Sequence, residues 1–125
     1  MENKWKNPNF FQALKNSING ISYTLKTQRN IKIQSVFAIL VIIIGFILKI
    51  SLIEWMILII TIFSVFVSEL FNTAIEKVVD LYTEEYNEKA KIAKDVASGA
   101  VSLIAVCSVL IGVLIFGVRI IKLIF

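Results

Sequence analysis

The sequence predicts an all-α integral membrane protein, with an N-terminal amphipathic surface helix followed by three transmembrane helices. Three observations favour this class. The 125 residues are 58% hydrophobic, three apolar stretches approach or exceed the length of a bilayer-spanning helix, and the segment before them has helical periodicity. A water-soluble domain this short could not bury so much apolar surface. With one Cys and no His, the chain also lacks the residues for an intrachain disulfide, a Cys/His zinc cluster or familiar His-dependent catalysis.

The apolar stretches cover residues 31–50, 52–79 and 96–124, and crossing a bilayer takes about 20 helical residues. The last third of the second stretch carries charged side chains. About residues 7–28 repeat apolar side chains at helical spacing, with Asn7-Pro8 as the expected helix start. We expect this helix to lie on the membrane surface with its apolar face down. We expect residues 1–125 to form a single membrane domain.

Basic residues are unevenly distributed around the predicted spans. Ten of the 13 Lys and Arg lie before or at the start of the first span, or around the connection between the second and third. Because cytoplasmic loops carry such an excess, we expect the N-terminus and the connection around residues 80–95 to lie in the cytoplasm and the C-terminus to lie outside. The net charge of +4 is then an orientation signature, and no nucleic-acid partner is expected. At the outer surface, Glu54 is expected to pair with Lys49 or to be solvated.

The second span carries a polar stripe. Glu69, Asn72, Glu76 and Asp80 fall at i, i+3, i+7 and i+11, within roughly 80° of arc on one helix face. Acids near or within apolar sequence are costly in lipid, so these must face protein, a cavity or a bound cation. A polar seam that only holds helices together is the alternative interpretation. Three acids on one face repel one another without a counter-ion, which favours a cation.

This oxygen-rich stripe predicts a site for a hard cation, with Mg²⁺ before any other. Lys94 stands where the third span enters the membrane, and it can hold a phosphate oxygen as a point charge. Glu69, deeper in the span, can accept a proton from a hydroxyl arriving through the bilayer. The constellation is suited to phosphoryl transfer to a membrane-embedded alcohol, although the pattern alone also fits an ion pathway. The sequence has no Walker A loop and no protein-kinase Gly-rich loop.

The segment ELFNTAIEKVVD, from Glu69 to Asp80, resembles the signature of the prokaryotic diacylglycerol kinase and undecaprenol kinase family. The Glu85-Tyr86 pair and the entry to the third span, Ala93-Lys94-Asp95 with Ser98 after it, match the same family. The resemblance covers nearly the whole chain. It implies a homotrimer of three-span chains, with active sites shared between neighbours at the cytoplasmic interface.

The resemblance also implies roles for individual residues. Glu69 would be the base that activates the lipid hydroxyl, and Glu76 would be a Mg²⁺ ligand. Lys94 would bind the γ-phosphate of ATP, and Ser98 would touch the lipid substrate. The residues implied near the nucleotide or other polar groups of the site are Asn72, Glu85 and Asp95.

Two positions depart from the family pattern. Before the first span, where the family has a metal-binding Glu, this chain has Gln28. The Gln28 amide oxygen can still coordinate Mg²⁺ and so contribute to the metal and nucleotide site, but it brings no negative charge. At the start of the surface helix, Asn9 stands where the family often has Arg.

From this resemblance we expect a protein of the bacterial inner membrane. Its expected activity is ATP- and Mg²⁺-dependent phosphorylation of a membrane lipid alcohol, with undecaprenol, giving undecaprenyl phosphate, preferred over diacylglycerol. The preference rests on the pattern over residues 25–30, which looks closer to the undecaprenol kinase branch. The alternatives are a diacylglycerol kinase making phosphatidic acid, a weak or inactive kinase homologue because of Gln28, and a non-catalytic small transporter or assembly subunit. Small exporters usually have one more span than this chain, and their acid is isolated.

Overall fold

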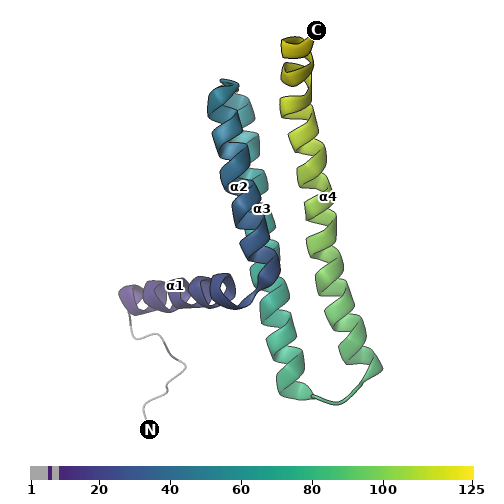
Figure 1. Cartoon of the computed structure of the whole chain (residues 1–125). Coiled ribbons are helices and arrows are strands. Elements are labelled where there is room, and N and C mark those ends of the chain that lie inside the picture. Colours follow the sequence, from purple (N-terminus) through teal and green to yellow (C-terminus); the bar gives the residue numbers. More distant parts are fainter. Residues whose placement is uncertain (1–5, 7–8) are drawn as a thin grey trace.

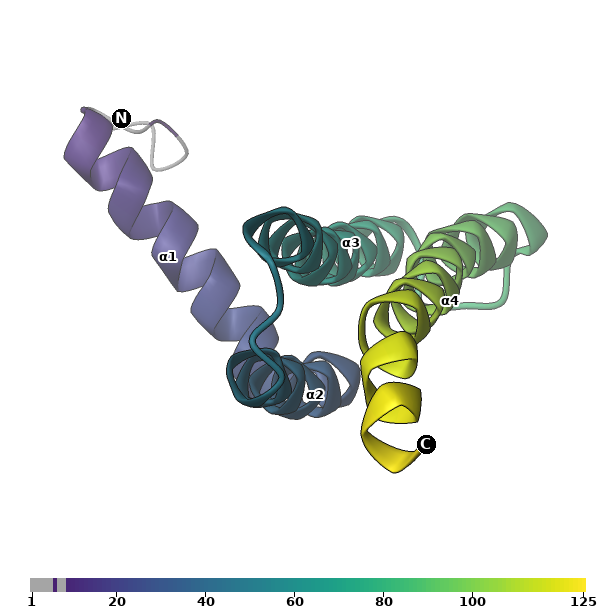
Figure 2. The same ribbon diagram turned by 90° about the horizontal axis from the view of Figure 1, so that it is seen from above.

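The computed structural model describes residue 6 and residues 9–125. This part of the chain forms four helices, α1 (Phe10–Thr27), α2 (Arg29–Ile47), α3 (Leu52–Tyr82) and α4 (Glu88–Ile124). Figure 1 shows α2, α3 and α4 running lengthwise and α1 projecting sideways from the start of α2. Seen from above, the three long helices form a triangle from which α1 extends outward (Figure 2). Each of α2, α3 and α4 is long and apolar enough to cross a membrane, which confirms the three predicted spans by length and composition.

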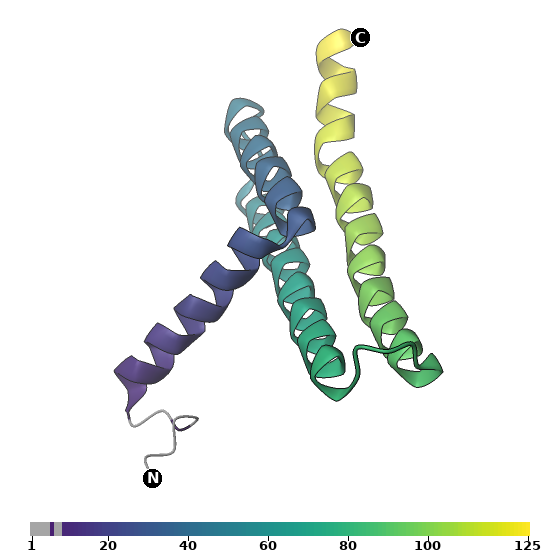
Figure 3. The same ribbon diagram turned by 60° about the horizontal axis from the view of Figure 1, so that its bottom comes forward.

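Helix α1 begins at Phe10 because Asn9 caps it. Asn9 is extended (φ −155°, ψ 171°), and its side-chain oxygen accepts a 2.9 Å hydrogen bond from the Gln12 N–H. The expected start at Asn7-Pro8 concerns two residues that lie outside the described part of the chain. A single extended residue, Gln28 (φ −94°, ψ 124°), separates α1 from α2. The chain bends at Gln28. Figure 3 shows the purple-to-blue helix α1 pointing away from the bundle of the other three helices.

A tight turn joins α2 to α3. Lys49 takes the left-handed conformation (φ 49°) just after α2 ends. Ser51 and Glu54 then form a capping box: the Ser51 N–H donates to Glu54 Oε2 (2.7 Å), and the Glu54 N–H donates to Ser51 Oγ (3.3 Å). Trp55 packs closely over Gly45, where a Cβ atom would lie 2.8 Å from the indole ring. The glycine therefore permits the aromatic side chain to close this end of the α2–α3 hairpin.

Helix α4 begins at Glu88, well before the predicted start of the third span at residue 96. Asn87 caps it by accepting a 3.1 Å hydrogen bond from the Ala90 N–H. Helix α3 likewise continues to Tyr82, past the predicted end of the second span at residue 79. Hydropathy locates the part of a helix that matches the membrane, whereas capping residues decide where the helix itself ends. The connection is therefore only residues 83–87.

The buried apolar cluster lies near the α2–α3 turn. Ile50 and Leu58 pack there with Ile115 and Phe116 of α4, and all four side chains are buried. Many large apolar side chains elsewhere on α2, α3 and α4 are exposed in the single chain. Such faces suit contact with lipid or with other chains. The cluster ties α4 to the turn end of the α2–α3 hairpin.

An ion pair between α3 and α4 lies beside this cluster. Arg119 Nη2 donates to Glu54 Oε2 at 2.7 Å, and Nη1 pairs with Oε1. The expectation that Glu54 pairs with Lys49 or is solvated is therefore wrong. A guanidinium group reaches both carboxylate oxygens as a fork, which an ammonium group cannot do. Because 65 residues separate the partners, their pairing depends on the antiparallel packing of the two helices.

Candidate active site

The polar stripe lies along α3 and is tied together by its own hydrogen bonds. Glu69 and Thr73 are 2% and 4% exposed, and Thr73 Oγ1 donates to the Glu69 carbonyl oxygen at 2.9 Å. Asn72 Nδ2 donates to Glu76 Oε1 at 3.1 Å. Because α3 runs unbroken from Leu52 to Tyr82, helical spacing alone brings these side chains to one face.

The buried end of the stripe contacts α2 through a residue that the sequence reasoning missed. Gln34 Nε2 donates to Glu69 Oε1 at 2.7 Å. A polar amide such as Gln34 in an otherwise apolar span is costly in lipid, so the sequence alone could have marked it as a residue that needs a polar partner. The Glu69 carboxylate is therefore held between two helices.

At the other end of the stripe, α4 supplies a cation. Lys94 Nζ lies 2.6 Å from Asp80 Oδ1, and the two side chains are 42% and 49% exposed. The structure thus brings Lys94 of α4 to the accessible end of the stripe. Asp95 instead pairs along its own helix with Lys91 at 2.5 Å. The stripe therefore runs from the buried Glu69 to an accessible ion pair.

A polar pocket of about 230 Å³ lies where α3, the connection and α4 meet. Asp80 and Lys94 line it together with Glu85 and Tyr86 of the connection. The Glu85 N–H donates to Thr83 Oγ1 at 3.1 Å, which orders the backbone there. The pocket is continuous with the accessible end of the stripe, so it can admit a charged group.

Two predicted site residues lie apart from these contacts. Ser98 is exposed on α4, and its carbonyl accepts a hydrogen bond from Ser102 Oγ. Gln28 sits at the bend between α1 and α2, where its N–H donates to the Thr24 carbonyl at 2.9 Å. Within the residues that the structure describes, no side-chain hydrogen bond joins Gln28 or Ser98 to the stripe.

The oxygen atoms of the stripe match Mg²⁺ in kind. Asn72 Oδ1 is buried and has no hydrogen-bond partner among the described residues, and the same amide contacts the Glu76 carboxylate. Across residue 6 and residues 9–125, no three Asp, Glu, Cys or His side chains are grouped to hold a metal within one chain. One chain therefore offers part of a coordination shell, and Mg²⁺ commonly completes its shell with water and phosphate oxygens.

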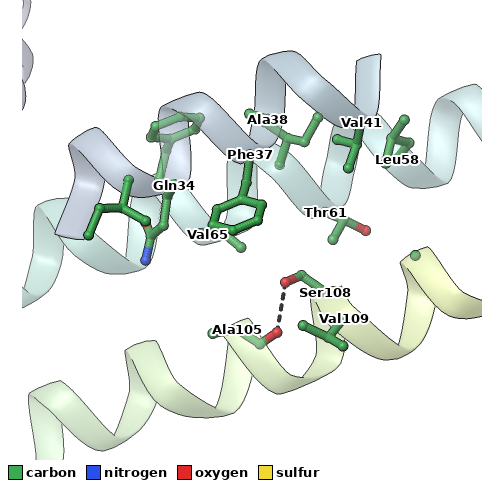
Figure 4. Close-up of a pocket in the computed structure, with 14 residues that line it drawn as sticks. Gln34, Phe37, Ala38, Val41, Leu58, Thr61, Val65, Ala105, Ser108 and Val109 are labelled. Atoms are coloured by element: carbon green, nitrogen blue, oxygen red, sulfur yellow. Dashed lines mark hydrogen bonds between the residues drawn. The ribbon is translucent and has the colours of Figure 1, made fainter. Parts of the chain in front are cut away.

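An apolar cavity of about 370 Å³ lies between α2, α3 and α4. Figure 4 shows its lining, with Gln34 toward one end of the labelled row and Leu58 toward the other. Ser108 also lines it, but its hydroxyl donates to the Ala105 carbonyl of its own helix at 2.7 Å. Apart from Gln34, the cavity therefore presents a largely apolar surface.

These features define a small helical membrane protein with a polar site at α3 and α4 and an apolar cavity beside it. The chain belongs to the prokaryotic diacylglycerol kinase family, whose model matches residues 15–116. This membership confirms the resemblance read from the segment between Glu69 and Asp80. The matched range also contains Gln28, Gln34 and Lys94.

Two relatives cover most of the chain. An undecaprenol kinase of Bacillus subtilis (strain 168) is 46% identical over 107 residues, which are 86% of this chain and 87% of that protein. A diacylglycerol kinase of Synechocystis is 40% identical over 113 residues, which are 89% of this chain and 65% of that protein. The chain is accordingly a lipid kinase, and kinase chemistry implies ATP as the phosphoryl donor.

Proposed function

We propose that this chain transfers the γ-phosphoryl group of ATP to the hydroxyl of a membrane lipid alcohol, with undecaprenol preferred. The observation that carries the proposal is the buried Glu69 carboxylate, linked by one polar helix face to the Lys94–Asp80 pair. An alcohol from the bilayer and a nucleotide from water can meet along such a stripe. The family membership supports the reaction class.

Glu69 acts as the general base. It takes the hydroxyl proton of the lipid, whose oxygen bonds to the γ-phosphorus as the bond to ADP breaks. The apolar cavity beside Gln34 suits the hydrocarbon chain of the alcohol, and Ser98 contacts the lipid from α4. Because Glu69 is 2% exposed, water has poor access to the base.

The accessible end of the stripe binds the nucleotide. Lys94, which now pairs with Asp80, supplies positive charge for the γ-phosphate. Glu76 and Gln28 hold Mg²⁺, which when bound neutralises charge on the phosphates. The Asn72 Oδ1 atom, which is buried and accepts no hydrogen bond from any described residue, supports an oxygen-rich site of this kind. The other residues assigned to the nucleotide and its polar surroundings are Asn72, Glu85 and Asp95.

The functional assembly that we propose is a homotrimer, with sites shared between neighbours. The exposed apolar helix faces and the incomplete set of acidic ligands in one described chain support this assembly. Helix α1 lies on the membrane surface. The N-terminus is in the cytoplasm and the C-terminus is outside, because most Lys and Arg residues lie on the N-terminal side of the first span and around the connection between α3 and α4. Native mass spectrometry in detergent should give the homotrimer as the main species, and a purely monomeric protein would contradict it.

Substrate preference rests on the similarity to the Bacillus subtilis undecaprenol kinase, which spans 87% of that protein. The test is reconstitution in vesicles with labelled ATP and Mg²⁺, supplying undecaprenol or diacylglycerol at equal mole fraction. We expect a higher kcat/KM for undecaprenol. A higher value for diacylglycerol would assign this chain the activity named for the Synechocystis relative.

Two variants show whether the transfer uses the proposed site. Glu69→Gln keeps the size and polarity of the side chain but removes the proton acceptor, so label transfer should fall by about 10²–10⁴-fold. Cys107→Ala, at an exposed position on α4, should transfer label at the wild-type rate. A wild-type protein that labels neither lipid while remaining assembled would favour a non-catalytic transporter, an assembly subunit or a disabled homologue.

A further inference from the structure

Gln34 makes the side-chain contact that joins α2 to the proposed base. Its Nε2 lies 2.7 Å from Glu69 Oε1, across 35 residues of sequence. Within the described chain, this is the side-chain hydrogen bond that the Glu69 carboxylate receives. The bond occupies one carboxylate oxygen and leaves Oε2 to meet the lipid hydroxyl.

The orientation of the Gln34 amide follows from its partner. A reversed amide would place two hydrogen-bond acceptors, Gln34 Oε1 and the Glu69 carboxylate, against each other. With Nε2 facing Glu69, the Gln34 Oε1 atom is buried and has no hydrogen-bond partner in the described chain. A buried carbonyl without a partner is unfavourable, so the amide is poorly explained as a group that only stabilises helix packing.

We propose that Gln34 is a positioning residue for the reaction, which holds the Glu69 carboxylate in the orientation needed to receive the hydroxyl proton. This inference rests on the proposed function, because it assigns Glu69 as the base. Gln34 also lines the apolar cavity, so the base is fixed where the lipid alcohol enters the polar site. Orientation of a catalytic group by a second, well-held residue is a general requirement of efficient catalysis.

The variant that tests this is Gln34→Met, which keeps an unbranched side chain of similar length and removes the N–H donor. Loss of a hydrogen bond to a charged group should lower kcat by about 10–100-fold. The KM for ATP should not change, because Gln34 lies away from the Lys94 end of the stripe. Gln34→His, whose ring N–H can reach a similar distance, should recover most of the rate.

Ser35→Ala is the matched control. Ser35 is the next residue of α2, and its hydroxyl donates to the Ile31 carbonyl of its own helix at 2.7 Å. Its kcat should remain within about twofold of the wild-type value. All variants are compared per folded protein, using far-UV circular dichroism and size-exclusion chromatography in detergent.

An unchanged kcat in Gln34→Met, or a loss that appears only in the KM for the lipid, would overturn the positioning role while leaving the lipid kinase intact. A wild-type protein that phosphorylates neither lipid would instead overturn the proposed function, and this inference with it. If Gln34→Met fails to assemble, Gln34→Asn provides the comparison, since it keeps an amide but is one methylene too short to reach Glu69. The proposal then requires Gln34→Asn to show the same loss of kcat.

Discussion

Replacing Gly45 with Ala should destabilise the turn end of the α2–α3 hairpin. A Cβ atom at Gly45 would lie 2.8 Å from Trp55 Cη2, 3.1 Å from Cζ2 and 3.2 Å from Ile50 Cδ1. Carbon atoms normally approach to about 3.5–4.0 Å, so the indole ring would have to move by roughly 1 Å. Phe46 already packs against that ring, with the centroids 4.7 Å apart, which restricts the movement.

The net effect is the difference between two contributions. Overpacking of a helix interface costs about 1–3 kcal/mol. Ala in place of Gly inside a helix recovers about 1 kcal/mol through its higher helix propensity. We therefore expect Gly45→Ala to lower the free energy of unfolding by about 0–2 kcal/mol.

Gly112→Ala isolates the packing contribution. Gly112 lies in α4, and a Cβ there would meet no atom of the described residues within 4 Å, so this variant gains helix propensity without a clash. In an SDS unfolding titration followed by circular dichroism, Gly45→Ala should be less stable than Gly112→Ala by about 1–3 kcal/mol. When each glycine variant is combined with Trp55→Leu, which shortens the side chain over Gly45, most of that difference should disappear. Equal stability of the two glycine variants would refute the close-contact explanation.

Three further changes probe the ion pairs and the metal site. Arg119→Met should lower resistance to SDS unfolding because Glu54 loses its partner, and adding Glu54→Gln should restore part of it; unchanged resistance in the single variant would show that the pair adds nothing. Gln28→Glu should lower the Mg²⁺ concentration for half-maximal activity by about tenfold, a factor equivalent to roughly 1.4 kcal/mol. No change would show that the absence of a negative charge at Gln28 does not weaken Mg²⁺ binding. Lys94→Met should raise the KM for ATP with little change in unfolding, because exposed ion pairs contribute little stability, and an unaltered KM would remove Lys94 from the nucleotide site.

The number and approximate position of the helices were predictable because hydropathy and periodicity are local properties. The ends were less predictable, since they depend on caps. Asn87 starts α4 in a charged segment that hydropathy assigns to a connection. Its capping hydrogen bond to the Ala90 N–H, which hydropathy does not record, sets that start.

In the candidate site, contacts within one helix or across a short connection were also predictable, whereas contacts between helices distant in sequence were not. Glu69 and Glu76 share a face because one helix carries both, and Lys94 reaches the stripe because the connection between α3 and α4 is short. Gln34 was missed because its partner is 35 residues away, and only the packing of α2 on α3 brings them together. The Arg119 partner of Glu54 was missed for the same reason.

Because Gln28 alone separates α1 from α2, its backbone torsions set the direction of the whole of α1. Its 18 residues span about 27 Å at 1.5 Å per residue, and the whole length pivots on two backbone torsions of Gln28. Rotating the pivot by about 10° would sweep the far tip through roughly 5 Å. Near the pivot, Thr24 and Ile31 are buried, and Lys77 of α3 lies 5.5 Å from the Tyr23 ring centroid. These contacts of the described residues lie close to Gln28, so a given rotation there would displace Phe10 much farther than Thr24.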